Sequence, residues 1–182
     1  QARTELKNEE PTFAEVADAE ASTPINTDGP YVSDCTLESD LELYFPDQYV
    51  PSDSERMLLY RELDNLQTDE QLEAYRRRME DRFGPVPPAA LELMHVVTLR
   101  RYACLLGCEK IILKQGRMSM YLVSKADSPY YQSEAFGRVI DFAVGNPRRC
   151  QLRDVNGKRS LLISNVPSVA EAIELLRPLT QQ

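Results

Sequence analysis

The residues with the chemistry for catalysis or metal binding are few in this sequence and widely spaced. His95 is the single histidine among 182 residues and lies beside an apolar stripe at helical spacing. A packed helix residue is commoner at such a place than a catalytic base. Cys104 and Cys108 are four residues apart, but neither a second close pair nor a group of histidines completes a zinc site. We therefore expect no catalytic residue, no metal site and no cofactor in this chain.

Phosphate-binding and nucleophile motifs are also missing from the sequence. It contains no glycine-rich nucleotide loop and no G-x-S-x-G elbow, and most of its seven glycines fall at predicted turns or helix ends. The adjacent carboxylates Glu80 and Asp81 diverge by about 100° on a helix and cannot share a proton. A solvated acidic face and a contact with a partner are the two interpretations that remain for this pair.

Arginine groups offer a different chemistry, the binding of phosphates. Arg76–Arg78, Arg100-Arg101 and Arg148-Arg149 could together form a basic surface, which makes a nucleic-acid-binding module the alternative function. Each group is flanked by acids or by helix ends, so ion pairs within the chain compete with that interpretation. Tyr130-Tyr131 is either an aromatic recognition spot or the anchor of a packed loop.

Charge is distributed unevenly along the chain. Residues 1–40 contain ten acidic and two basic residues, whereas the remainder contains 19 of each, and the net charge is −8. A neutral body lacks the basic footprint expected of a nucleic-acid-binding domain.

The apolar runs of the sequence are too short to cross a bilayer, and the four scattered cysteines suit reduced thiols. We expect a cytoplasmic protein without a membrane contact. Because the chain opens with Gln1, we interpret it as a piece of a larger protein.

The first 36 residues differ in composition from the rest. They contain few large apolar side chains and two patches hostile to helices, Thr23-Pro24 and Asp28-Gly29-Pro30. We predict an acidic, largely flexible interdomain linker over residues 1–36, with a short helix over residues 12–21. A single regulatory domain is predicted over residues 37–182.

Local signals divide this domain into a helical half, residues 37–108, and a sheet half, residues 109–182. Alternation of Leu41, Leu43 and Phe45 predicts an N-terminal strand that stops at Pro46. Three helices follow: capping boxes at Ser52–Glu55 and Thr68–Gln71 open two of them, and Pro87-Pro88 opens the third. The third helix is expected to place on its core face Leu91, Met94, Thr98 and Leu105.

The sheet half has a doubled pattern. Residues 110–114 and 118–123 form one predicted hairpin, and residues 150–155 and 158–164 flank the turn signal Asn156-Gly157 of another. Each hairpin precedes a helix, capped by Ser133 and Ser168 respectively. The predicted fold class is therefore α+β, an N-terminal strand and three helices followed by a β-β-α-β-β-α antiparallel sheet with helices on one side.

Several motifs of the sequence resemble one known family. They are Phe45-Pro46-Asp47-Gln48-Tyr49-Val50-Pro51, Glu55-Arg56, Leu59-Tyr60-Arg61, Asp81-Arg82-Phe83-Gly84-Pro85-Val86-Pro87 and Leu106-Gly107-Cys108-Glu109-Lys110-Ile111. In order and spacing these motifs resemble the C-terminal (TRCF) domain of bacterial transcription-repair coupling factors, the Mfd family, well over residues 37–115 and loosely beyond.

The resemblance implies a non-catalytic role in a larger machine. The family's full-length protein is an ATP-driven DNA translocase, with ATP and magnesium in its motor domains. It displaces stalled RNA polymerase and recruits the nucleotide-excision-repair protein UvrA through a UvrB-like module. The C-terminal domain docks on that module of the same chain, masks the UvrA-binding surface and restrains the motor.

The resemblance also implies which residues dock. The family uses acidic residues near the Asp-Arg-Phe-Gly turn, paired with arginines on the partner, and Asp81 stands at the matching position here. One helical turn earlier, where the family often has another acid, this chain has Arg78. Glu80 or Glu73 could compensate, and Arg82 belongs to the same motif. We therefore predict Asp81, Glu80, Glu73 and Arg82 as partner-binding residues.

Overall fold

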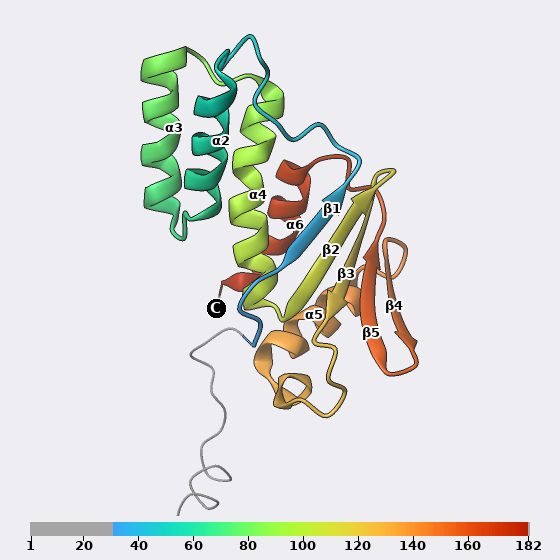
Figure 1. The fold of residues 1–182 in the computed structure, drawn as a ribbon. Helices are drawn as coiled ribbons and strands as arrows, with labels where there is room; N and C mark the ends of the chain where they lie inside the picture. Colours follow the sequence, from blue (N-terminus) through green and yellow to red (C-terminus); the bar gives the residue numbers. More distant parts are fainter. Residues whose placement is uncertain (1–30, 182) are drawn as a thin grey trace, which may run out of the picture.

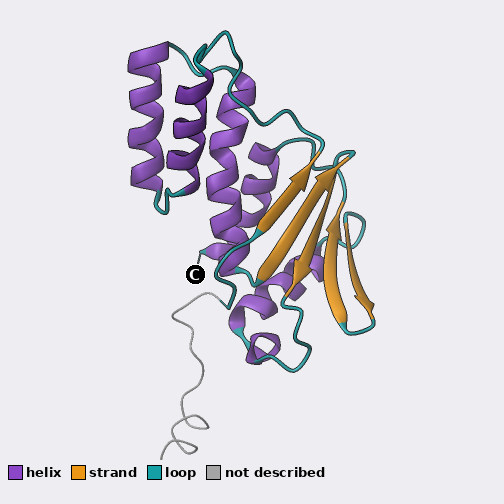
Figure 2. Ribbon diagram, in the orientation of Figure 1, coloured by secondary structure: helices purple, strands orange, loops and turns teal. Residues whose placement is uncertain are grey.

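The computed structural model describes residues 31–181, so the predicted helix over residues 12–21 and most of the predicted linker lie outside the described residues (Figure 1). Figure 2 colours the helices and strands by type and shows the helices beside a single sheet. The elements are β1 (Thr36–Ser39), α2 (Asp53–Asp64), α3 (Asp69–Phe83), α4 (Pro88–Leu105), β2 (Cys108–Lys114), β3 (Arg117–Leu122), the short 3-10 helix η1 (Pro129–Gln132), α5 (Glu134–Gly145), β4 (Cys150–Val155), β5 (Lys158–Ile163) and α6 (Val169–Thr180).

The five strands form one mixed sheet in the order β1-β2-β3-β5-β4. β2, β3, β5 and β4 pair antiparallel, as the two predicted hairpins require, whereas β1 pairs parallel with β2. The α+β class is confirmed. The sheet is mixed rather than purely antiparallel because the chain leaves β1 for three helices before it returns as β2.

The predicted strand over Leu41–Phe45 is wrong; the N-terminal strand is Thr36–Ser39. Leu41 and Leu43 pack against the core beneath the sheet, while Phe45 is buried in a second core among the helices. The backbone N–H of Phe45 donates to the Tyr60 hydroxyl at 2.9 Å rather than to a strand. The apolar alternation thus marks an irregular segment that passes from one core to the other.

The start of the packed chain also differs from the predicted boundary at residue 37. Val32 and Cys35 are buried in the core beneath the sheet, inside the stretch predicted as a linker. The Arg100 side chain donates to the Cys35 carbonyl at 2.8 Å and holds this stretch against α4. Among the described residues of that stretch, the packing therefore begins before residue 37.

Two hydrophobic cores share helix α4. The smaller, which we name the helical core, lies among α2, α3 and the first half of α4 and consists of Phe45, Val50, Leu63, Tyr75, Met79, Ala90 and Met94. The larger, the sheet core, lies between the sheet and α4, α5 and α6 and takes Leu99 and Ala103 from α4. The expected core face of α4 is therefore correct at Met94 and wrong at Leu105, which is 43% exposed.

Helix starts follow the predicted caps. Thr68 and Gln71 form the full reciprocal capping box at the start of α3. The side chains of Ser52, Ser133 and Ser168 accept backbone N–H groups at the starts of α2, α5 and α6. Such caps satisfy donors that would otherwise lack partners, and they fix where each helix begins.

Candidate functional site

The four predicted partner-binding residues, Glu73, Glu80, Asp81 and Arg82, all lie on α3. Two tyrosines hold this helix in place. The Tyr75 hydroxyl donates to the Leu59 carbonyl of α2 at 2.9 Å, and the Tyr49 hydroxyl donates to the Gly84 carbonyl at 2.9 Å. The middle and the C-terminal end of α3 are therefore fixed, and its polar side chains project from a well-packed support.

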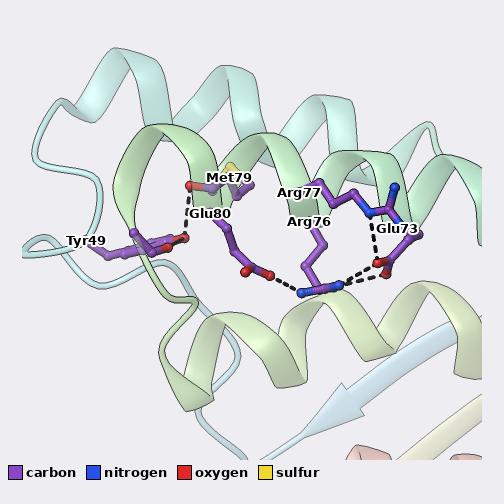
Figure 3. Close-up of polar contacts among 7 residues, drawn as sticks. Tyr49, Glu73, Arg76, Arg77, Met79 and Glu80 are labelled. Atoms are coloured by element: carbon purple, nitrogen blue, oxygen red, sulfur yellow. Dashed lines mark hydrogen bonds and ion pairs between the residues drawn. The ribbon is translucent and has the colours of Figure 1, made fainter.

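Glu73 and Glu80 bind the same arginine within the helix. Figure 3 shows the Arg76 side chain between them, with an Arg76 Nε–Glu73 Oε2 distance of 3.0 Å and a second contact to Glu80. Arg77 also pairs with Glu73 at 3.3 Å. The hydrogen bond from Arg76 lowers the pKa of Glu73 below its usual range. These two carboxylates are thus largely neutralised by their own helix.

Arg82 and Arg78 connect α3 to α2. Arg82 pairs with Glu55 and Arg78 pairs with Glu62. Arg78 stands where the resemblance predicts an acid, and here it links the two helices. Like Glu73 and Glu80, Arg82 therefore has an ion-pair partner within this chain.

Asp81 differs from the other three. It is exposed, and no ion pair or hydrogen bond involves its carboxylate within residues 31–181. It borders an open hollow of about 350 Å³ between α2 and α3, and the side chains around this hollow are Leu59, Glu62, Tyr75, Arg78, Met79, Arg82 and Phe83. A free carboxylate beside apolar walls can accept a guanidinium from another surface while the arginine stem packs into the hollow.

The arginine groups do not form one surface. Arg101 pairs with Asp69 at 2.6 Å, and Arg149 donates to the carbonyls of Ser164 and Asn165 at 2.9 and 2.7 Å. Arg100 pairs with Asp34 at 2.5 Å. Together with the pairs made by Arg76–Arg78, these contacts confirm that intramolecular bonding uses most of these guanidinium groups.

His95, Cys35 and Cys108 each contact other side chains of the domain. His95 Nδ1 lies 3.2 Å from Glu92, and Glu92 accepts the backbone N–H groups of Val169 and Ala170 at 2.8 and 3.1 Å. Cys35 and Cys108 are buried side by side. Burial raises the pKa of the Cys108 thiol, and the hydrogen bond from Cys108 lowers that of Cys35. Within residues 31–181, no three His, Cys, Asp or Glu side chains group as a metal site.

Tyr130 and Tyr131 are loop anchors rather than an exposed recognition spot. Tyr130 is buried, and its hydroxyl donates to the Leu106 carbonyl at 2.6 Å. Tyr131 packs edge-on against it, with ring centroids 4.9 Å apart.

Of the described helices, none has both the length and the apolar character needed to span a membrane.

Comparison with known proteins places this architecture in a family. The profile of the TRCF domain matches residues 39–133, which include all of α3. The chain belongs to the TRCF domain family. A transcription-repair-coupling factor of Staphylococcus epidermidis is 27% identical over 128 residues, covering 67% of this chain and 11% of the relative. That of Escherichia coli is 32% identical over 66 residues, covering 36% of this chain and 6% of the relative.

The TRCF resemblance found in the motifs is thus confirmed. The fold agrees with the crystal structure of the C-terminal domain of a transcription-repair coupling factor, at a TM-score of 0.65 and 13% identity, covering 80% of this chain and 91% of that one. This chain spans 11% of the Staphylococcus relative's length. It therefore corresponds to one TRCF domain of much longer proteins.

Proposed function

We propose that this TRCF domain is a non-catalytic regulatory domain of a bacterial transcription-repair coupling factor. It docks through α3 on the UvrB-like module of the same parent chain, masks the UvrA-binding surface and restrains the motor until RNA polymerase is engaged. ATP and magnesium would act in the parent's motor domains, and this domain would need no cofactor. In this docking role, contacts with UvrA, polymerase and duplex DNA would be made indirectly, through the parent.

The observation that carries this proposal is the free carboxylate of Asp81 beside the α2–α3 hollow. Glu73 and Glu80 share Arg76, and Arg82 is bound to Glu55, so Asp81 is the predicted residue with its charge available. An arginine of the partner can pair with Asp81 in a bidentate arrangement. The other three residues would then position α3 rather than bind the partner themselves.

A restraint that must be released calls for a weak interface. A single charged contact at the rim of an open hollow is easily displaced by competing contacts. Tethering within one chain raises the local concentration to about the millimolar range, so a weak contact suffices to keep the domain docked. The pairing of an exposed carboxylate with an arginine also predicts that docking weakens as salt is added.

Charge reversal at Asp81 tests the proposal. Binding of the 182-residue chain to the parent's UvrB-like module would be measured by calorimetry, with and without UvrA as competitor. We expect Asp81→Arg to weaken binding about tenfold or more, since it replaces attraction by repulsion. In the full-length parent the same change should raise UvrA binding and basal ATPase activity.

Asp64→Arg is the matched control. Asp64 is an exposed acid at the opposite end of the α2–α3 pair and has no ion pair within the described residues. Reversing it changes the net charge by the same amount and should leave binding unchanged. If both variants bind like the wild type while remaining folded, Asp81 is not the docking residue. Equal weakening by both would indicate a diffuse charge effect instead.

A further inference from the structure

Residues 37–182 have a net charge of only −2 but consist of two halves with opposite charge. Residues 37–108 contain fourteen acidic and eight basic residues, whereas residues 109–182 contain seven acidic and eleven basic residues. Several cations of the second half make no ion pair within residues 31–181, namely Arg117, Lys125, Arg148, Arg153 and Lys158. The sheet half thus has a basic surface that the overall neutrality conceals.

Strand alternation places three of these cations, Arg117, Arg153 and Lys158, on one face of the sheet. The inward side chains Ile111, Met118 and Leu161 are buried beneath α4, α5 and α6, so their neighbours in the strands point to the opposite face. Figure 1 shows these three helices on one side of the sheet. The cations on the opposite, open face are Lys110, Lys114, Arg117, Arg153 and Lys158.

One carboxylate lies among them on the same face. Glu38 of β1 pairs with Lys110 at 3.0 Å and with Lys114 at 3.9 Å. The hydrogen bond from Lys110 lowers the pKa of Glu38. The positive charge of Arg117, Arg153 and Lys158 is left uncompensated on this face.

A row of side chains crosses the open face at right angles to the strands. The register aligns Lys110 of β2 with Tyr121 of β3, Tyr121 with Ser160 of β5, and Ser160 with Arg153 of β4. Three strand spacings separate the outer two residues, which places their backbones about 14 Å apart. Tyr121 lies between the two cations and is 39% exposed.

The surface beside Tyr121 is hollowed. An open depression of about 390 Å³ has an apolar floor from Ile112, with Lys110 and Lys158 among the side chains around it. Leu122 also borders it, but its side chain is buried in the sheet core. The remaining lining residues are Glu109, Tyr121, Ser124 and Arg159. Glu109 accepts a hydrogen bond from the Ser124 hydroxyl at 3.4 Å. The depression is large enough for a nucleobase with its sugar.

We propose that this open sheet face binds single-stranded nucleic acid. A base would stack on Tyr121 over the apolar floor, while neighbouring phosphates would contact Lys110, Lys158 and Arg153. Open sheets with an exposed aromatic ring between cations suit unstacked bases, because the ring supplies a stacking platform and the cations follow the backbone. An acidic peptide would use the cations but not the ring. The proposal goes beyond the docking function and uses different elements. The Asp81 variants therefore test docking, whereas the Tyr121 and Lys158 variants test nucleic-acid binding.

Fluorescence anisotropy with a labelled oligothymidylate about twelve nucleotides long tests the stacking step. We expect Tyr121→Ala to raise the dissociation constant about tenfold and Tyr121→Phe to preserve binding. Tyr44→Ala is the matched control, since Tyr44 is a comparably exposed tyrosine, 43% against 39%, in the other half of the domain. It should leave the dissociation constant unchanged.

Salt dependence tests the phosphate contacts. Lys158→Gln should weaken binding and reduce the slope of log affinity against log salt by about 0.7, the value for one phosphate contact in a single strand. Arg61→Gln is the control, because Arg61 is an exposed cation of α2 without an ion pair in the described part of the chain. Its slope should match that of the wild type.

Four outcomes would overturn the proposal. The first is no binding at about 50 mM salt with protein in the tens of micromolar range. The second is an unchanged affinity in Tyr121→Ala. The third is a duplex of the same length that binds as tightly as the single strand, which would indicate a general attraction to phosphate. The fourth is that polyglutamate displaces the oligonucleotide and that Tyr121→Ala binds polyglutamate as well as the wild type does. This result would assign the face to an acidic protein.

Discussion

The two halves of this TRCF domain differ in how many of their basic residues form ion pairs. In the helical half, seven of the eight basic residues form ion pairs with acids of the same chain. In the sheet half, five of eleven do so. What the helical half leaves available is therefore negative, as at Asp81, and what the sheet half leaves available is positive.

This difference shows why a net charge near zero says little about partners. Each surface selects by its own local charge, and screening limits the influence of the other half to about 10 Å at ordinary salt. A cationic protein surface suits α3 and a polyanion suits the open sheet. Helix α4 joins the two halves mechanically, because its first half completes one core and its second half the other.

Gly107, which lies against Tyr130 of the sheet half, and Gly84, which lies within the helical half, give the largest expected contrast. Both have a positive φ, +80° and +89°, but a Cβ on Gly107 would lie 2.1 Å from the Tyr130 ring, whereas one on Gly84 meets nothing within 4 Å. Gly107→Ala should cost about 4 kcal/mol, from overpacking together with backbone strain, and Gly84→Ala about 1–3 kcal/mol from strain alone. Urea unfolding measures both. Equal losses would show that the Tyr130 loop moves aside freely.

Truncations on α4 test whether the two cores unfold together. Met94→Ala opens the helical core and Leu99→Ala the sheet core, and each should lower the free energy of unfolding by about 3 kcal/mol. Because α4 belongs to both cores, circular dichroism and tyrosine fluorescence should report one coincident transition in each variant. A second transition confined to Met94→Ala would show instead that the helical half unfolds independently.

Features with local causes were predictable from the sequence. Caps such as Thr68 and turns such as Asn156-Gly157 lie within a few residues of what they control, and the structure has them where they were predicted. The strand Thr36–Ser39 was missed because it exists only through pairing with residues 110–113, which a local pattern does not specify. Leu105 was misplaced because α4 changes cores along its length, so no single stripe describes it.

The candidate surfaces depended on different information. Asp81 came from the resemblance, and its free carboxylate emerged once the partners of its neighbours were known. The open sheet face was missed since its residues come from four strands. The signal was present as the alternation of Lys110, Ile112 and Lys114 within β2, but the register of the sheet was needed to align Tyr121 with Arg153.

A buried tyrosine in each core provides a comparison of moderate size. Tyr75 and Tyr130 each donate to a backbone carbonyl, and burial raises the pKa of both. Each Tyr→Phe change should cost about 1 kcal/mol at neutral pH.

The pH dependence of these tyrosines has a definite sign. A raised pKa in the folded state contributes stability that is complete below the ordinary tyrosine pKa of about 10 and declines as pH rises above it. Tyr75→Phe and Tyr130→Phe should therefore flatten the alkaline loss of stability, measured by urea unfolding above pH 10 with ionisation followed in the ultraviolet. If both variants lost stability at alkaline pH as steeply as the wild type, the loss would be due to groups other than these two tyrosines.

The smallest expected effect compares an ion pair within α3, Arg76–Glu73, with one on the open sheet face, Lys110–Glu38. A hydrogen bond from the cation lowers the pKa of each carboxylate, so each pair adds stability above the ordinary glutamate pKa and loses it as pH falls through the lowered value. In NMR titrations, Arg76→Gln should raise the pKa of Glu73 and Lys110→Gln that of Glu38, while global stability changes little because both pairs are exposed. The two variants should then separate by function, since only Lys110→Gln removes a cation from the open sheet face. If Arg76→Gln weakened oligonucleotide binding as much as Lys110→Gln, the charge division between the halves would have no bearing on partner choice.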